Sequence, residues 1–339
     1  MANLYQKMNA AFHVGKHRIA IRETPIPKIS EDEYLIKTKA CAICGSDLRW
    51  WSREATNEIH GHESIGIVVD AGRNATAFQE GDRVIPYVIR GCGRCAFCSR
   101  GFYIYCKQNT GITTGFAEYQ AVPERYLMDV PGCFNDEEAT LLGDNLGTPL
   151  RALRKASVEE GETAVVFGLG PLGLIAIQGL LFFGAENVIG IDVQKNRCDI
   201  ATELGATLTL DASTVDFHRQ VFRITKGIGA HVVINTVDAA DAAAAAFNLL
   251  RPGGRLILIA GNCTGYGGQG ELRGRAERQI IGTFYFPRTD YEENIRIVRS
   301  GLINLKRLVS HVYPFEEINE AFEMRFKNPD KCLKVVIGL

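Results

Sequence analysis

A glycine-rich turn between an apolar strand and an apolar helix constrains the fold of this chain more than any other feature. The strand is predicted at Thr163–Phe167, and it leads directly into Gly168-Leu169-Gly170-Pro171-Leu172-Gly173, where an apolar helix opens. A second apolar strand ends at Asp192, nineteen residues after Gly173. Strand, glycine turn, helix and acid-terminated strand in this order form the fingerprint of a dinucleotide-binding βαβ unit.

The residues of this turn have distinct mechanical roles. We expect Gly168 to permit the tight turn, Gly170 to let the backbone approach a pyrophosphate, and Gly173 to let the helix pack closely on the strand. Pro171 and Leu172 open the helix, whose N-terminus attracts the phosphates.

Asp192 is the residue that distinguishes the two nicotinamide dinucleotides. Its carboxylate can accept both ribose hydroxyls of NAD and would repel the 2′-phosphate of NADP, so the sequence favours NAD. Lys195 and Arg197 follow closely and could tolerate that phosphate, which weakens the preference. Asp192 could also cap the next helix, a role that is compatible with ribose binding.

The chain after this strand continues to alternate strands and helices. This rhythm predicts an α/β domain with a doubly wound parallel sheet. A methyl-donor or flavin site is the alternative for such a domain, but the metal motifs described next favour hydride transfer. We expect helices at 194–204 and 290–300, an alanine-rich helix capped by Asp238, and strands at 231–235, 255–260, 279–284 and 333–337.

Four cysteines in a short segment predict a closed metal site. Four thiolates wrapped around one ion are typical of structural zinc. An iron–sulfur cluster or a redox pair is the competing interpretation, but the ferredoxin pattern places its fourth cysteine three residues on, followed by proline. The segment contains Cys92, Cys95, Cys98 and Cys106, separated by two, two and seven residues, and turn-forming glycines at 91, 93 and 101.

Residues 41–63 hold a second set of metal-binding side chains. A thiolate, an imidazole and a carboxylate together suit a zinc site that keeps one position open for chemistry. On spacing alone, a buried thiol and a hydrogen-bonded core histidine remain the alternative, and two histidines compete as the ligand. The segment offers Cys44, Ser46, Asp47, His60, His62 and Glu63.

The amino-terminal third has the alternating pattern of short strands and turns, which predicts a compact β-rich domain of barrel or roll type. Over the whole chain 46% of residues are hydrophobic and the net charge is −1, without a basic run, which argues against nucleic acid or an anionic membrane as a partner. The sequence shows neither a signal peptide nor an apolar run long enough to span a membrane. We therefore expect a cytoplasmic protein whose cysteines are ligands or buried thiols.

The motifs CGSD, GHE, GDRV, the four-cysteine segment and GFAEY follow one another along the chain. In this order they resemble the zinc-containing alcohol dehydrogenases of the medium-chain dehydrogenase/reductase family, and the resemblance covers essentially the whole chain. It implies a β-rich, GroES-like catalytic domain beside a Rossmann domain with a doubly wound parallel sheet. The implied boundaries are 1–147 for the catalytic domain with its zinc lobe at 91–107, 148–284 for the Rossmann domain, and 285–339 for a return segment that completes the catalytic domain.

The resemblance assigns roles to the residues of the second metal motif. Cys44 and His62 occupy the positions of catalytic zinc ligands, and Glu63 that of an adjacent carboxylate that can enter the metal shell. Ser46 takes the place of the hydroxyl that hydrogen-bonds the alcohol oxygen. Asp47 takes the place of the carboxylate that holds His62, and a ligating imidazole needs such a partner at its other nitrogen.

Asp144 departs from the pattern of many relatives, which carry a cysteine after the glycine corresponding to Gly143. Polyol dehydrogenases of the family have a glutamate there, so we expect Asp144 to be an acidic third ligand of the catalytic zinc. The alternative is a cap for a helix that starts near Thr148.

Arg49 is a second departure, because many relatives have a histidine there that passes a proton to solvent. Ser46 with the cofactor ribose, or Glu63 through water, would then carry the proton. We expect Arg49, Trp50 and Trp51 near the substrate cleft, with loop packing as the alternative for the two tryptophans.

The resemblance implies two zinc ions per chain, one catalytic and one structural, and NAD as the cofactor. It also places the ends of two strands beside the nicotinamide, which implies contacts from Val237, Ala260 and Asn262.

The implied reaction interconverts a secondary alcohol of a polyol, sugar, cyclitol or amino-polyol with its ketone. A threonine- or diol-type dehydrogenase is the alternative, and a catalytically inactive zinc- and NAD-binding protein is the alternative of another class. A zinc-free reductase of activated double bonds would lack the pair Cys44 and His62. The family further implies a small-molecule substrate and a homodimer or homotetramer.

Overall fold

The computed structural model describes residues 7–111, 114–260 and 276–339. The chain forms two compact units. The first unit comprises Met1–Asp144, Pro287–Tyr291 and Leu305–Leu339, and the second comprises Asn145–Phe286 and Glu292–Asn304. In the described part of the chain, no helix is long and apolar enough to cross a membrane.

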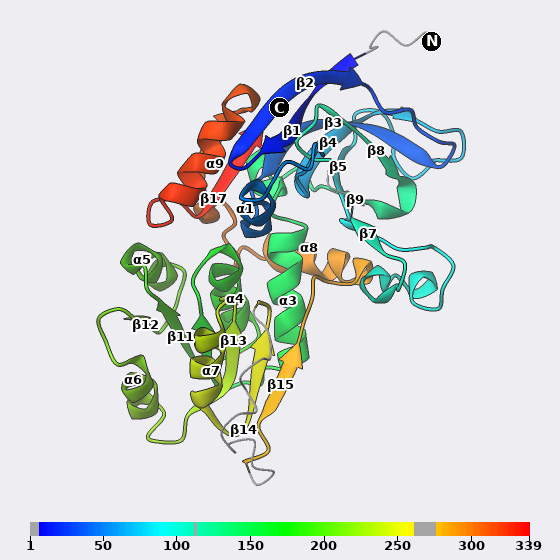
Figure 1. The fold of residues 1–339 in the computed structure, drawn as a ribbon. Coiled ribbons are helices and arrows are strands. Elements are labelled where there is room, and N and C mark those ends of the chain that lie inside the picture. Colours follow the sequence, from blue (N-terminus) through cyan, green and yellow to red (C-terminus); the bar gives the residue numbers. More distant parts are fainter. Residues whose placement is uncertain (1–6, 112–113, 261–275) are drawn as a thin grey trace. The chain divides into compact units, whose positions relative to one another are not determined.

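The second unit is built on a parallel sheet with the strand order β12-β11-β10-β13-β14-β15 (Figure 1). All residues of β10 are buried, as expected for a central strand covered on both faces. The chain runs outward from β10 to β12 and then returns to the other side of β10, so the carboxyl ends of β10 and β13 form the switch point where doubly wound sheets bind ligands. The strands are β10 Thr163–Phe167, β11 Asn187–Asp192, β12 Leu208–Asp211, β13 Ala230–Asn235, β14 Leu250–Leu258 and β15 Gln279–Gly282.

Helices follow the strands of this sheet. Apolar side chains from neighbouring strands, such as Val165, Ile189, Val233 and Leu256, form the core of the unit. The helices are α3 Asp144–Ala156, α4 Pro171–Phe182, α5 Lys195–Glu203, α6 Phe217–Ile224, α7 Ala240–Asn248 and α8 Tyr291–Arg299, of which α3 and α8 begin on the last residues of first-unit segments.

The first unit contains a larger sheet with the order β16-β17-β3-β4-β5-β9, in which β8 also pairs with β3. Its register places Ala42 of β3 opposite Val336 of β17 on one side and Glu63 of β4 on the other. Strand β17 is therefore separated by the single strand β3 from β4, which begins with Glu63 of the second metal motif.

The elements of the first unit are mostly strands joined by short helices and turns. The strands are β1 Lys7–Gly15, β2 Arg18–Pro25, β3 Glu33–Ala42, β4 Glu63–Ala71, β5 Arg83–Pro86, β6 Ile89–Arg90, β7 Thr110–Gly111, β8 Tyr119–Pro123, β9 Leu127–Asp129, β16 Val309–Pro314 and β17 Lys334–Gly338. The helices are α1 Gly45–Trp51, α2 Asp136–Ala139 and α9 Ile318–Lys327, and two 3₁₀ turns, Cys98–Arg100 and Tyr103–Tyr105, shape the four-cysteine segment.

The predicted fold class is confirmed, since a doubly wound parallel sheet lies in one unit and a β-rich fold in the other. Two predicted helix starts are wrong. The backbone of Ala239 is extended and forms the N-cap of α7, so Asp238 is not the cap. Helix α3 starts at Asp144 and not near Thr148, and it carries Pro149 in its interior, although proline favours the first turn of a helix.

Candidate metal centres and cofactor site

Four possible metal ligands from separate parts of the first unit lie together. Cys44 immediately precedes α1, and His62 immediately precedes β4. Glu63 is the first residue of β4, and Asp144 is the first residue of α3. One ligand atom from each lies within 4.8 Å of the others, and Nε2 of His62 is 3.7 Å from Oδ2 of Asp144. Ligands about 2.1 Å from a tetrahedral zinc would be roughly 3.4 Å apart, so these two atoms have nearly the spacing of zinc ligands. The thiolate, imidazole and carboxylates are all donor types that zinc accepts.

The carboxylate of Asp47 contacts the ring nitrogen of His62 that does not face Asp144. Oδ1 of this buried carboxylate lies 3.3 Å from Nδ1 of His62, and its Oδ2 accepts a hydrogen bond from the backbone N–H of Cys44 at 2.8 Å. Burial alone would lower the pKa of His62, but Asp47, Cys44 and Asp144 raise it well above its ordinary value. The negative charge that favours a proton on His62 equally favours a bound cation, so the electrostatics of the site fit a metal.

A buried lysine, which sequence reasoning missed, pairs with Glu63. Nζ of Lys334 lies 2.7 Å from Oε2 of Glu63, and the two side chains are 4% and 1% exposed. Burial alone would lower the pKa of Lys334, but the neighbouring Glu63 and Cys44 raise it above its ordinary value, which favours the protonated ammonium of Lys334. The signal in the sequence is a lysine at the start of the apolar run 334–338, where a cation needs a buried partner.

Ser46 and Arg49, which are predicted to serve the substrate, both lie on α1. Ser46 is half-buried in the first turn of the helix, two residues after Cys44, and Arg49 is exposed one turn further on. The helix therefore carries the hydroxyl of Ser46 close in the chain to the metal ligand Cys44.

Trp50 and Trp51 have different surroundings. Trp50 is half-buried and stacks on His60, with ring centroids 4.0 Å apart. Trp51 is 1% exposed and packs against His17 and Phe326. The burial of Trp51 favours the alternative of loop packing for this residue, because its apolar surface is already covered by the protein.

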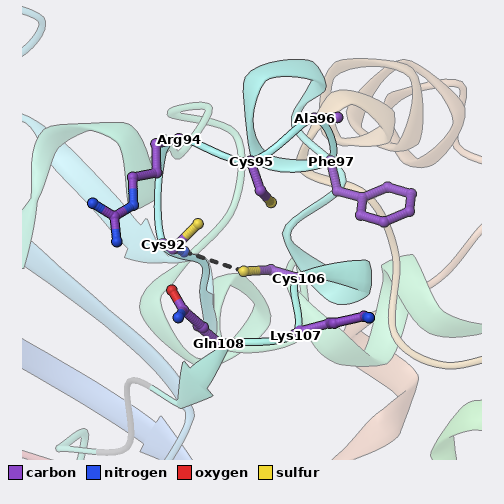
Figure 2. Close-up of a pocket in the computed structure, with 8 residues that line it drawn as sticks. All are labelled: Cys92, Arg94, Cys95, Ala96, Phe97, Cys106, Lys107 and Gln108. Atoms are coloured by element: carbon purple, nitrogen blue, oxygen red, sulfur yellow. Dashed lines mark hydrogen bonds between the residues drawn. The ribbon is translucent and has the colours of Figure 1, made fainter.

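The four cysteines of the other motif gather on the lobe at residues 91–107. Figure 2 shows the sulfur atoms of Cys92, Cys95 and Cys106 turned toward one another, and the backbone N–H of Cys92 donates to Sγ of Cys106 at 3.3 Å. Sγ of Cys92 is 4.0 Å from Sγ of Cys98. Zinc–sulfur bonds of about 2.3 Å place tetrahedral sulfurs roughly 3.8 Å apart, so this spacing fits one zinc ion.

The backbone of the lobe is shaped around these sulfurs. A Cβ atom at Gly91 would lie 2.5 Å from Sγ of Cys98, so glycine is needed for the close approach. Backbone N–H groups of Arg94 and Cys95 lower the pKa of the Cys92 thiol to about 6, whereas burial raises that of Cys98 to about 12. A divalent cation bound by all four sulfurs would favour the thiolate at Cys98 as well, as a closed structural site requires.

Replacing Cys98 by serine is expected to remove one zinc per chain and to lower the free energy of unfolding by at least about 4 kcal/mol, the range typical of a lost structural metal. Cys133→Ser is the control, because Cys133 is an exposed cysteine outside both donor sets. Metal analysis and thermal unfolding of both variants would measure the effect. A Cys98→Ser protein with two zinc ions and an unchanged melting temperature would contradict the structural role of the lobe.

The glycine turn of the second unit has the geometry of a phosphate cradle. Gly168 has φ +93°, a conformation that side chains rarely adopt, and a Cβ atom at Gly173 would overlap the carbonyl oxygen of Gly168. The space beside Gly170 is open. Helix α4 begins at Pro171 and Leu172, and its N-cap Gly170 has no side chain to cap it. The first N–H groups of the helix are therefore suited to receive a phosphate.

Asp192 lies at the end of β11 beside this turn and is 8% exposed. Its Oδ2 accepts from the backbone N–H of Leu169 at 2.7 Å, and its Oδ1 accepts from that of Gln194 at 2.9 Å. Nη1 of Arg197 is 3.7 Å from Oδ2. Because a carboxylate has further lone pairs, a carboxylate fixed in this way can still accept ribose hydroxyls.

Asn235 ties together the two strand ends that were predicted to face the nicotinamide. Its buried Nδ2 donates to the carbonyl oxygens of Val237 and Ala260, each at 3.1 Å. Sequence reasoning named Val237 and Ala260 but missed Asn235, whose signal is a polar residue at the end of an apolar strand. Asn262 lies outside the residues that the structure describes.

Both halves of the chain match models of known protein families. Residues 30–132 match the alcohol dehydrogenase GroES-like domain, and residues 171–300 match the zinc-binding dehydrogenase domain. These ranges contain the four-cysteine lobe and most of the doubly wound sheet.

Relatives match along nearly the whole chain. The chain is 31% identical to the probable D-xylulose reductase A of Emericella nidulans over 91% of this chain and 90% of that protein, and 29% identical to the sorbitol dehydrogenase of Bacillus subtilis over 98% and 97%. The structure of alcohol dehydrogenase TADH from Thermus sp. ATN1 is similar, with a TM-score of 0.89, 27% identity and coverage of 98% and 99%. The chain therefore belongs to the medium-chain family of zinc-dependent alcohol dehydrogenases and is an oxidoreductase.

Proposed function

We propose that the protein is a zinc-dependent dehydrogenase that uses NAD(H) to interconvert a secondary alcohol of a polyol, sugar, cyclitol or amino-polyol with its ketone. The observation that carries this proposal is the meeting of Cys44, His62, Glu63 and Asp144 in one donor set. The names of a xylulose reductase and a sorbitol dehydrogenase among the relatives support a polyol substrate. The acidic residue at position 144 supports it too, through its resemblance to polyol dehydrogenases.

Cys44, His62 and Asp144 would hold the catalytic zinc. The pairing of Glu63 with Lys334 supports Asp144 as the usual third ligand, because Glu63 already has a buried cation beside it. When bound, the zinc supplies Lewis acidity, which lowers the pKa of a water ligand to about 7 and acidifies an alcohol in the same sense.

The chain's own side chains would orient the site and move the proton. Asp47 keeps the proton of His62 on Nδ1, so that Nε2 faces the metal position. The hydroxyl of Ser46 would accept the proton of the substrate alcohol and pass it onward. Arg49 occupies the position at which many relatives have a histidine that passes the proton to solvent. In this chain the proton would therefore leave by the cofactor ribose or by Glu63 and water.

The glycine turn 168–173 and Asp192 would bind NAD in the second unit, with Arg197 beside the carboxylate. Val237 and Ala260 would flank the nicotinamide, held in place by Asn235. The preference for NAD over NADP rests on the buried carboxylate of Asp192, which is poorly compatible with a 2′-phosphate. Cys92, Cys95, Cys98 and Cys106 would hold the structural zinc.

A substrate panel tests this proposal. The zinc-loaded enzyme is expected to reduce NAD⁺ with one or more polyols, cyclitols or amino-polyols, at least about tenfold more efficiently than it reduces NADP⁺, measured by the absorbance of the reduced nicotinamide. Turnover confined to threonine or to vicinal diols would favour the threonine- or diol-type alternative. An enzyme that binds two zinc ions and NAD but oxidises no alcohol of the panel would support the inactive binding protein.

The same proposal includes the setting in which the enzyme works. We propose a small-molecule substrate and a homodimer or homotetramer, which the resemblance to the family supports, and a cytoplasmic location, which the lack of a recognisable signal peptide supports. The proposed domain boundaries are 1–147, 148–284 and 285–339. Light scattering of the purified protein would measure the oligomeric state.

A further inference from the structure

Asp47 has three neighbours that compete for its two oxygen atoms. Oδ2 accepts from the backbone N–H of Cys44 at 2.8 Å. Oδ1 accepts from the indole Nε1–H of Trp50 at 3.1 Å and also faces Nδ1 of His62 at 3.3 Å. The indole therefore shares an acceptor atom with the imidazole that is proposed to bind the catalytic zinc.

The indole of Trp50 is itself held in place by a cluster of rings. It stacks on His60 with centroids 4.0 Å apart and planes 13° apart, and it lies edge-on to His13 at 5.0 Å. Phe322 packs at 5.5 Å. Oγ1 of Thr56 lies 3.3 Å from Nδ1 of His13 and 3.3 Å from Nε2 of His60, so the two imidazoles are linked to each other. The direction of the indole N–H is thus set by packing on several sides.

We propose that Trp50 is a positioning residue for His62. Its N–H fixes Oδ1 of Asp47, and Asp47 in turn keeps the proton of His62 on Nδ1 and directs Nε2 toward the metal position. A carboxylate that is only 2% exposed has little access to water, so an oxygen that loses a donor is not readily re-solvated. Without the indole N–H, the Cys44 N–H still holds Oδ2 but, among the residues that the structure describes, no fixed donor outside His62 holds Oδ1, so the carboxylate can turn about the remaining bond and the imidazole loses its fixed orientation.

The neighbouring tryptophan provides a contrast within the same helix. Trp51 is 1% exposed, and its Nε1 has no hydrogen-bond partner among the residues that the structure describes. Its ring packs against Phe322 and Phe326. Removing the N–H of Trp50 breaks a link to the metal ligands, whereas removing that of Trp51 breaks no hydrogen bond.

The test compares Trp50→Phe with Trp51→Phe, since each change keeps an aromatic ring and removes one N–H. Zn²⁺ and Co²⁺ binding to the catalytic site is measured by chelator competition, together with the visible spectrum of the Co²⁺ form. We expect Trp50→Phe to weaken metal binding by up to about 10-fold, the lower end of the range for direct partners of a ligating histidine, because Trp50 acts through Asp47. We also expect it to shift the Co²⁺ spectrum and to lower kcat, whereas Trp51→Phe should leave all three unchanged.

This inference rests on the proposed role of His62, so His62→Ala is measured alongside. If His62→Ala keeps its metal, the proposed site itself is wrong. If His62→Ala loses its metal while Trp50→Phe keeps wild-type affinity and spectrum and only raises KM, Trp50 contacts the substrate and the positioning role is overturned. Equal losses in both tryptophan variants would also overturn it, because they would reflect the packing of the helix and not the hydrogen bond to Asp47.

Discussion

The Cys44→Ser enzyme is expected to keep its fold and lose at least about a thousandfold in kcat/KM. The substitution exchanges a thiolate for a hydroxyl of similar size at the one sulfur of the donor set with His62, Glu63 and Asp144. A bound metal contributes several kcal/mol of charge stabilisation to such a reaction, and each 1.36 kcal/mol is a factor of ten in rate. Turnover of the preferred polyol and zinc content would be measured on the same preparation, where we expect one zinc per chain to remain in the four-cysteine lobe.

Cys41→Ser is the matched control for this variant. Cys41 lies three residues earlier, is fully buried in β3 and is not part of the donor set. Burial raises the pKa of its thiol well above the ordinary value, so it is a neutral packing group and not a thiolate ligand. Full activity and two zinc ions in Cys44→Ser, or an equal loss in both variants, would contradict the role proposed for Cys44.

The glycine turn could be predicted from the sequence because its parts are contiguous. A buried strand, a turn that requires positive φ and a helix opened by proline follow one another within twenty residues, and the observed bounds of β10 and the start of α4 agree with that prediction. Local propensity and the long-range fold agree here, which is typical of sequences that specify one structure. The four-cysteine lobe is local in the same sense.

The second metal site could not be predicted from contiguous residues. Asp144 is a hundred residues from Cys44, and its nomination came from a resemblance and not from periodicity or spacing. The start of α3 at Asp144 also differs from the expected start near Thr148, and Pro149 inside the helix is a residue that favours the first turn. Lys334 and the indole bond of Trp50 were missed altogether. Both depend on which strands pair and on how rings pack, and neither leaves a period or a fixed spacing in the chain.

Lys334→Met is expected to lower the free energy of unfolding by about 3–5 kcal/mol, the typical effect of leaving one partner of a buried ion pair without compensation. The pair joins the first residues of β4 and β17, with Nζ of Lys334 2.7 Å from Oε2 of Glu63 and both side chains almost fully buried. Methionine keeps most of the volume of lysine and removes the charge together with the N–H donors. Urea unfolding of the zinc-loaded protein would measure the loss, with Lys331→Met, at an exposed position three residues earlier, as the control.

The double variant Glu63→Gln with Lys334→Met separates the ion pair from simple packing. Removing both charges should restore most of the stability, because exchanging a whole buried pair for neutral groups is often close to neutral, whereas damage to packing would persist.

The pH dependence of stability gives a second criterion. Because the pKa of Lys334 lies above its ordinary value, its contribution is present below the unfolded pKa of about 10.4 and is lost as the pH rises through the folded value. The stability difference between wild type and Lys334→Met should therefore be constant near neutral pH and shrink in strong alkali. A Lys334→Met protein as stable as wild type at neutral pH would show that the pair does not stabilise the sheet.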